Sequence, residues 1–169
     1  MLFKLKLKNT FFGGQSLIEV VVSVGVAVLL AVSLITTSLI TQKSSRSARN
    51  NSQATKLVQQ TLEQLRVLRD RKGFSVATFP DAPTPTCFTF NSTDPEPINW
   101  ALISTNCSDP LTNSQTITLD TTNFIRKIEM VNQGAINEKR LITVTVSWDE
   151  SGQTRSVKSQ TFLSLWQDF

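Results

Sequence analysis

The sequence predicts an α+β fold, in which a long N-terminal helix is followed by a small head built on an antiparallel β-sheet. The first observation is a run of 23 uncharged, mostly apolar residues from Val20 to Gln42, which is typical of a helix that spans a membrane. The second is a stripe of aliphatic residues at helical spacing, which extends the helix to Lys72. The third is the alternation of apolar and polar residues within residues 140–166, which predicts strands with one buried face.

The segment before the apolar run has the features of a leader peptide. Three lysines, at positions 4, 6 and 8, are followed by Gly13 and Gly14. A secretory signal peptide has its small-residue cleavage site after its apolar core, whereas here the small residues come before it. Cleavage at the glycines would retain the helix, so we expect a leader over residues 1–14 and a helix over residues 15–72.

Residues 17–41 are expected to span the membrane, and Glu19 is the only charged residue within them. The alternative for this segment is a buried helix of a soluble protein. A carboxylate in a membrane segment is costly and marks a functional candidate. Cleavage between Gly14 and Gln15 would create an α-amino group one helical turn before Glu19, and the two charges would neutralise each other within one helix or between neighbouring helices. The alternative is that Glu19 extends to the lipid headgroups.

The polar continuation of the helix contains no proline or glycine from Gln42 to Lys72, and Gly73 is a natural stop for it. Its apolar stripe is the natural cover for the sheet, because the apolar face of a sheet needs a second layer. The stripe consists of Leu57, Val58, Thr61, Leu62, Leu65 and Leu68.

Residues 73–169 are expected to form the head. Its first part is rich in loops, because all six prolines lie between positions 80 and 110. Its last three strands are consecutive, with a turn over residues 149–153, and predict an antiparallel meander. The three tryptophans are expected to pack in the core or at its edge rather than to stack on a ligand. The expected strands cover residues 87–90, 99–103, 115–120, 124–131, 140–148 and 154–166, and the tryptophans are Trp100, Trp148 and Trp166.

The chain has two cysteines, Cys87 and Cys107, and no histidine. Two cysteines beyond a membrane segment indicate one disulfide in an oxidising compartment, and the alternative is two buried free thiols. The lack of histidine excludes Cys/His metal sites and histidine general bases. No other catalytic constellation stands out, so we expect no enzymatic activity, no cofactor and no metal.

The net charge of +4 is unevenly distributed along the chain. Residues 15–72 carry eight basic and three acidic side chains, whereas residues 73–169 carry six basic and ten acidic ones. The eight cations lie within residues 43–72. A stacking surface for single-stranded nucleic acid requires aromatic side chains among the cations, and this segment has none. We interpret them as solvated charges on a helix and expect no nucleic-acid partner.

A family resemblance is carried by the residues GGQSLIEVVV at positions 13–22. This segment resembles the class III signal of type IV prepilins and of the pseudopilins of type II secretion. The resemblance implies that a prepilin peptidase cleaves after Gly14 and N-methylates Gln15, and that Glu19, fifth after the cut, acts in assembly. The sequence departs from the family pattern at Gln15, where phenylalanine is commonest.

Two further departures favour a minor pilin or a pseudopilin over a major pilin. Thr36 stands where major pilins often have proline, and Cys87 and Cys107 lie early in the head, whereas major pilins often have a disulfide near the C-terminus. The composition of residues 141–166 resembles that of minor pilins of the V type and pseudopilins of the I type.

The resemblance implies a structural subunit of a type IV pilus or a type II secretion-like filament. Its expected partners are the prepilin peptidase, other pilin or pseudopilin subunits, and the assembly platform of the cytoplasmic membrane. The head would lie outside the cytoplasm, in a periplasmic or cell-surface filament. Ser23, Ala27 and Ala31 share one helix face and form a candidate packing seam. The alternatives are a tip-located pilin whose head binds a ligand, a surface or DNA, and an enzyme anchored by its helix.

Overall fold

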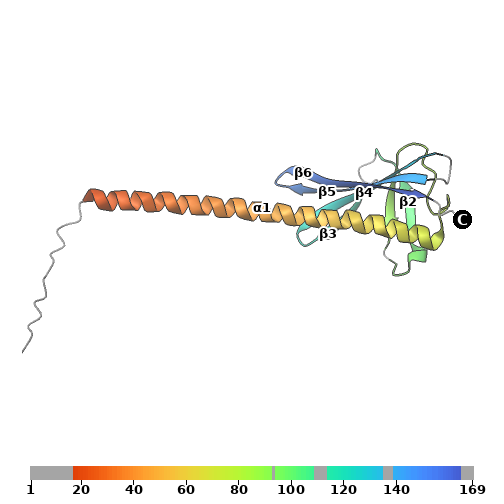
Figure 1. Ribbon diagram of the computed structural model, residues 1–169, viewed down its shortest axis with the longest axis horizontal. Coiled ribbons are helices and arrows are strands. Elements are labelled where there is room, and N and C mark those ends of the chain that lie inside the picture. Colours follow the sequence, from red (N-terminus) through yellow and green to blue (C-terminus); the bar gives the residue numbers. More distant parts are fainter. Residues whose placement is uncertain (1–16, 93, 109–113, 135–138, 165–169) are drawn as a thin grey trace, which may run out of the picture. The chain divides into compact units, whose positions relative to one another are not determined.

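The computed structural model describes residues 17–92, 94–108, 114–134 and 139–164. One long α-helix is followed by six antiparallel strands that form one sheet, so the predicted α+β class is confirmed (Figure 1). The chain divides into two compact units, Met1–Ser45 and Arg46–Phe169. The first unit contains the apolar part of the helix, and the second contains the polar part of the helix together with the sheet.

Helix α1 extends from Leu17 to Lys72, over 56 residues. It ends as the sequence predicts, because Gly73 adopts a φ of 79° and its amide donates a 2.7 Å hydrogen bond to the carbonyl oxygen of Arg69. Glycine reaches this left-handed conformation without steric cost. Arg69, Arg71 and Lys72 place positive charge at the negative end of the helix dipole.

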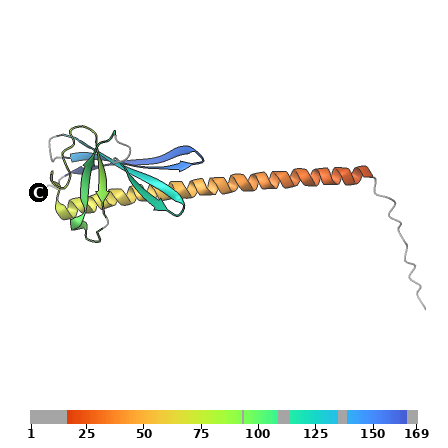
Figure 2. The same ribbon diagram turned by 180° about the vertical axis from the view of Figure 1, so that it is seen from behind.

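The sheet has the strand order β2-β1-β4-β5-β6, and β3 pairs with β4 beside this path. Strand β4 is long enough to have two neighbours on one side: β3 pairs with residues 122–126 and β1 with residues 128–130 (Figure 2). The strands are β1 Thr86–Asn91, β2 Ala101–Thr105, β3 Gln115–Leu119, β4 Thr122–Asn132, β5 Lys139–Glu150 and β6 Gln153–Ser164.

The predicted meander is strands β4, β5 and β6. Its second hairpin closes with Ser151 and Gly152, both at positive φ, which is the backbone that a two-residue turn between twisted strands requires. The strand expected over residues 99–103 begins later, at Ala101, because Pro97–Asn99 forms a short 3-10 helix, η1. Trp166, which was expected to lie in the last strand, lies outside the described residues.

The core lies between the polar part of α1 and one face of the sheet. All six residues of the predicted stripe are buried, and Ala54 extends the stripe by one turn. The aliphatic members of the stripe belong to one cluster with Ile128 of β4 and with Ile142 and Val144 of β5, so the expected cover of the sheet is confirmed. Each leucine buried in this way stabilises the fold by roughly 1.5–3 kcal/mol relative to an exposed one.

Two arginines are also buried in the head, which the sequence did not lead us to expect. Arg126 of β4 is 7% exposed, and Arg140 of β5 is 1% exposed. The side chain of Arg140 lies over the ring of Phe74, with its guanidinium carbon 5.0 Å from the ring centroid, and its Nε donates to Asn132. Burial lowers the pKa of the Arg140 guanidinium, and the nearby carboxylate of Asp81 opposes this effect.

Candidate functional site

The apolar part of α1 is the first candidate site, because its side chains have no cover. Leu17 is 80% exposed and Leu34 is 73% exposed, and every described residue from Leu17 to Gln42 is exposed. The helix is long and apolar enough to span a membrane by itself. So large an apolar surface requires lipid or other helices around it.

Four hydroxyl side chains in this segment are satisfied within the helix. The hydroxyls of Ser23, Thr36 and Thr37 donate to the carbonyl oxygens four residues earlier, over 2.7–2.9 Å. Thr41 makes the same bond to Thr37. These bonds allow hydroxyl-bearing residues to lie in an apolar environment, where an unpaired polar group is costly.

Glu19 lies in the first described turn of α1 and is exposed. The positive end of the helix dipole favours a carboxylate there. Within the parts of the chain that the structure describes, no cation forms an ion pair with Glu19. Gly14 and Gln15, the predicted cleavage and methylation residues, lie outside the described residues.

The expected packing seam lies on the same exposed segment. Ser23, Ala27 and Ala31 follow one another at four-residue intervals, and all three are exposed. Small side chains at this spacing allow a second helix to approach closely.

In the second unit, the two hairpin tips are bound to the first turns of the polar helix segment. Asp120, at the β3–β4 turn, accepts a 3.3 Å hydrogen bond from Gln53 and forms a 3.8 Å ion pair with Arg49. Glu150, at the β5–β6 turn, accepts a 3.2 Å bond from Ser47. These contacts were not predicted, because the partners lie far apart in the sequence and are individually unremarkable polar residues.

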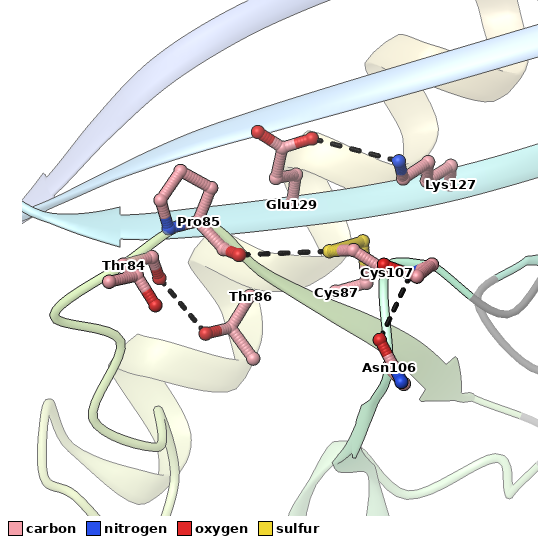
Figure 3. Close-up of a disulfide and its surroundings, with 9 residues drawn as sticks. Thr84, Pro85, Thr86, Cys87, Asn106, Cys107, Lys127 and Glu129 are labelled. Atoms are coloured by element: carbon pink, nitrogen blue, oxygen red, sulfur yellow. Dashed lines mark hydrogen bonds and ion pairs between the residues drawn. A yellow bond between two sulfur atoms is a disulfide. The ribbon is translucent and has the colours of Figure 1, made fainter.

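The structure contains the predicted disulfide between Cys87, on β1, and Cys107, just after β2 (Figure 3). The two Cα atoms are 5.0 Å apart. Cys87 is fully buried, on the face of the sheet opposite the helix, and pairs in register with Glu129. The bond closes a loop that contains η1 and β2, and so fixes the edge of the sheet.

The head offers little that resembles a catalytic or metal site. Across the described ranges, no group of three or more His, Cys, Asp or Glu side chains is placed to hold a metal ion. Trp148 is buried against Phe124, and Trp100 packs edge-on against Phe90, so both pack as predicted. A shallow groove of about 580 Å³ runs along the exposed side of α1 and is lined by Lys56, Gln59, Gln60, Leu62, Glu63 and Arg66.

Comparison with known proteins adds nothing to this geometry: no protein-family model, curated protein or solved structure matches the chain. The functional interpretation therefore depends on the residues themselves. The exposed apolar helix with its single carboxylate is the feature that most requires an explanation.

Proposed function

We propose that the chain is a structural subunit of a type IV pilin-like filament, a minor pilin or a pseudopilin. A prepilin peptidase removes residues 1–14 by cutting after Gly14 and methylates the new N-terminal residue, Gln15. The apolar helix then holds the subunit in the cytoplasmic membrane, with the head outside the cytoplasm. An assembly platform transfers the subunit into a filament, where helices of neighbouring subunits replace lipid.

The observation that carries the proposal is the position of Glu19 in the structure. This carboxylate lies in the first described turn of an uncovered apolar helix, five residues after a glycine pair that follows a basic leader in the sequence. A charge is not required for a helix that only anchors a protein in a membrane. Inserting a charged residue costs about 2.5–3.5 kcal/mol at mid-membrane and less near the interface. A subunit that packs by pairing charges between helices needs one.

The mechanism follows from the charges that cleavage creates. Cutting after Gly14 turns a neutral peptide nitrogen into an ammonium group four residues before Glu19, which is one helical turn. The ammonium and the carboxylate neutralise each other most strongly where water is excluded, because the effective dielectric constant is low there. A subunit already in the filament presents its Glu19 to the amine of an incoming helix and so selects processed chains.

The rest of the apolar segment supports packing into a filament. Hydroxyl groups bonded within the helix cost little on transfer between lipid and a helix bundle, because no protein or water partner is lost. The seam of Ser23, Ala27 and Ala31 gives neighbouring helices a surface for close approach. Helix packing of this kind requires no catalytic group in the head.

Mass spectrometry of the native protein tests the proposal. We expect a chain that begins at Gln15 and carries one additional methyl group. A chain that retains its lysine-rich start, or that is cut after the apolar segment, would refute the proposal. A chain that begins at Gln15 but has lost ammonia by cyclisation would carry no N-terminal cation, which would contradict the charge-pairing mechanism while leaving the cleavage intact.

A further inference from the structure

Charge is segregated between the two edges of the sheet. The loop before β2, at one edge, carries Asp94 and Glu96, and neither β1 nor β2 contains a lysine or arginine. Strand β6, at the opposite edge, carries two cations, Arg155 and Lys158, and no carboxylate. The head therefore has one acidic edge and one basic edge within a single compact unit.

The basic edge is open and continues onto the helix. Strand β6 pairs with β5 along its whole length, and its other side has no strand partner among the residues that the structure describes. Arg155 and Lys158 are exposed and form no ion pair in the described part of the head. The groove on α1 lies beside this strand, because its Arg66 reaches Thr161 of β6 over 3.5 Å.

The acidic edge centres on the loop that enters β2. Asp94 accepts hydrogen bonds from the amide of Glu96 (2.8 Å) and from the side chain of Asn99 (3.0 Å), which are neutral donors and leave its charge uncompensated. Glu96 is exposed, and the described residues offer its side chain no cation. The loop is held in place by Lys72, whose ammonium donates a 2.7 Å bond to the carbonyl oxygen of Trp100.

The two edges do not neutralise each other within one molecule. Strands β1, β4 and β5 lie between β2 and β6, and at about 4.8 Å per strand step the edges are roughly 19 Å apart. That separation exceeds the Debye length of about 8 Å at physiological ionic strength. Each edge also exposes a large apolar side chain beside its charges: Ile98 is 51% exposed at the acidic edge, and Phe162 is 60% exposed on β6.

We propose that the basic β6 edge of one head binds the acidic loop before β2 of a second copy of this chain. Lys158 and Phe162, which share one face of β6, lie against Glu96 and Ile98 of the second copy, and Arg155, on the other face of the same edge strand, adds positive charge opposite Asp94. Because this contact joins two different surfaces of the same chain, a pair of copies still has one free basic edge and one free acidic loop. Further copies can add to these surfaces, and the assembly is an open helix when the rotation does not close. This inference rests on the proposed filament function and adds to it a specific contact between the heads of two neighbouring subunits.

A second copy of this chain is the partner that would use both charged edges of the head. An anionic polymer or a lipid surface would use the basic edge but would leave the acidic edge, on the same head, without a role. Opposite potentials on facing surfaces mainly set orientation and rate of association, which is what ordered addition of subunits requires.

Zero-length cross-linking of the full chain in membranes tests the contact directly. A carbodiimide joins a carboxylate to an amine only where the two touch, so we expect a peptide in which Lys158 is linked to Glu96 or Asp94. To identify links between molecules, membranes from ¹⁵N-labelled cells and from unlabelled cells are solubilised, mixed and allowed to reassemble before cross-linking. We expect linked peptides in which one partner is labelled and the other is not. Links confined to one chain, links from Lys158 to another protein, or no link at Lys158 in assembled subunits would each overturn the proposal.

Charge-reversal variants test the same contact by a second route. We expect Lys158→Glu and Glu96→Lys each to reduce co-purification of two differently tagged copies by about three- to tenfold, because each replaces an attraction with a repulsion. Combining the two reversals in one chain should restore co-purification. The control is Lys127→Glu, which changes the charge of a side chain on the central strand β4, two strands from either edge.

The outcomes separate this inference from the function on which it rests. A chain that is cleaved at Gly14 and assembles, yet gives no rescue in the double variant, refutes the head contact alone. A chain that is not processed at all refutes the proposed function.

Discussion

The guanidinium of Arg126, on strand β4, donates a 3.1 Å hydrogen bond to the hydroxyl of Thr61, in the buried stripe of α1. The same hydroxyl donates a 2.7 Å bond to the carbonyl oxygen of Leu57, so that it acts as donor and acceptor at once. Arg126 also donates to the side-chain oxygen of Gln115 on β3 and, over 3.5 Å, to the carbonyl oxygen of Phe90 on β1. One buried cation thus joins the helix to three strands through neutral acceptors.

The environment of Arg126 makes the charge costly. Burial lowers the pKa of its guanidinium, and none of the partners described for it is a carboxylate. Arginine nevertheless remains protonated at neutral pH, because its ordinary pKa lies far above it. The folded protein therefore depends on the neutral acceptors to replace the water that the cation has lost.

We predict that removing an acceptor is more destabilising than removing the cation. Thr61→Val deletes one acceptor and leaves the buried charge less satisfied, which should cost about 1–3 kcal/mol of unfolding free energy. Arg126→Met removes the buried charge and keeps most of the volume, and the acceptors that it leaves behind are neutral, so we expect a smaller loss. Thermal unfolding of the full chain in detergent, followed by near-ultraviolet circular dichroism, compares them. A larger loss for Arg126→Met than for Thr61→Val would contradict this account.

The disulfide gives a second prediction about stability. It links residues 20 apart in the sequence, and closing a loop of this length stabilises a fold by roughly 3 kcal/mol in the chain-entropy model. We expect the double variant Cys87→Ala, Cys107→Ser to unfold about 10 °C lower than the native protein. Reductant should lower the melting temperature of the native protein to a similar value and should leave that of the variant unchanged. An equal effect of reductant on both proteins would contradict the prediction.

Much of the fold follows from the period of the apolar residues. A helical period over residues 57–68 and a period of two in β5 are each long enough to identify the element and its buried face. The predicted start of β2 at residue 99 was too early, because Pro97–Asn99 forms a short 3-10 helix. A three-residue helix of this kind has little sequence signal beyond its proline, whereas the apolar residues that follow favour a strand. Long-range contacts such as Arg49–Asp120 have no local signature.

The buried arginines show where the sequence held a signal that was not used. Arg126 shares the parity of Phe124, Ile128 and Met130 on β4, and all four side chains face the core. Arg140 likewise shares the parity of Ile142 on β5. Alternation in a strand fixes the face of every residue, whatever its charge. For the candidate site, the sequence identified Glu19 directly, whereas the structure adds that its helix is uncovered.

The proposed cleavage site predicts the effect of a branched side chain at Gly14. We expect Gly14→Val to abolish cleavage, because a prepilin peptidase that cuts after glycine would have to accommodate an isopropyl group next to the scissile bond. An immunoblot should show only the full-length chain, with its basic leader.

Gly25→Val is the matched control for this substitution. It makes the same chemical change in the apolar segment, where an added Cβ would meet nothing within 4 Å and β-branched residues are already common. We expect Gly25→Val to be cleaved normally. Mature-length protein from Gly14→Val, or loss of cleavage in Gly25→Val, would show that cleavage does not depend specifically on the glycine at position 14.

Glu19 provides the sharpest test of the charge-pairing mechanism. We expect Glu19→Ala to leave cleavage largely intact and to impair assembly severely, because the N-terminal ammonium of an incoming subunit would lose its partner in a medium of low dielectric constant. Glu19→Gln should behave like Glu19→Ala, since it keeps the size of the side chain and removes only the charge. The measurements are the length of the chain by immunoblot and the yield of sedimentable filaments.

Glu129→Gln is the control for the loss of a carboxylate. This residue lies on the sheet, where its 3.8 Å ion pair with Lys127 is half-exposed and therefore contributes little. It should assemble normally. If Glu19→Gln also assembles normally, the carboxylate acts through its shape or its hydrogen bonds rather than its charge, and the pairing mechanism fails. If Glu19→Gln is not cleaved, Glu19 is read by the peptidase, and its role precedes assembly.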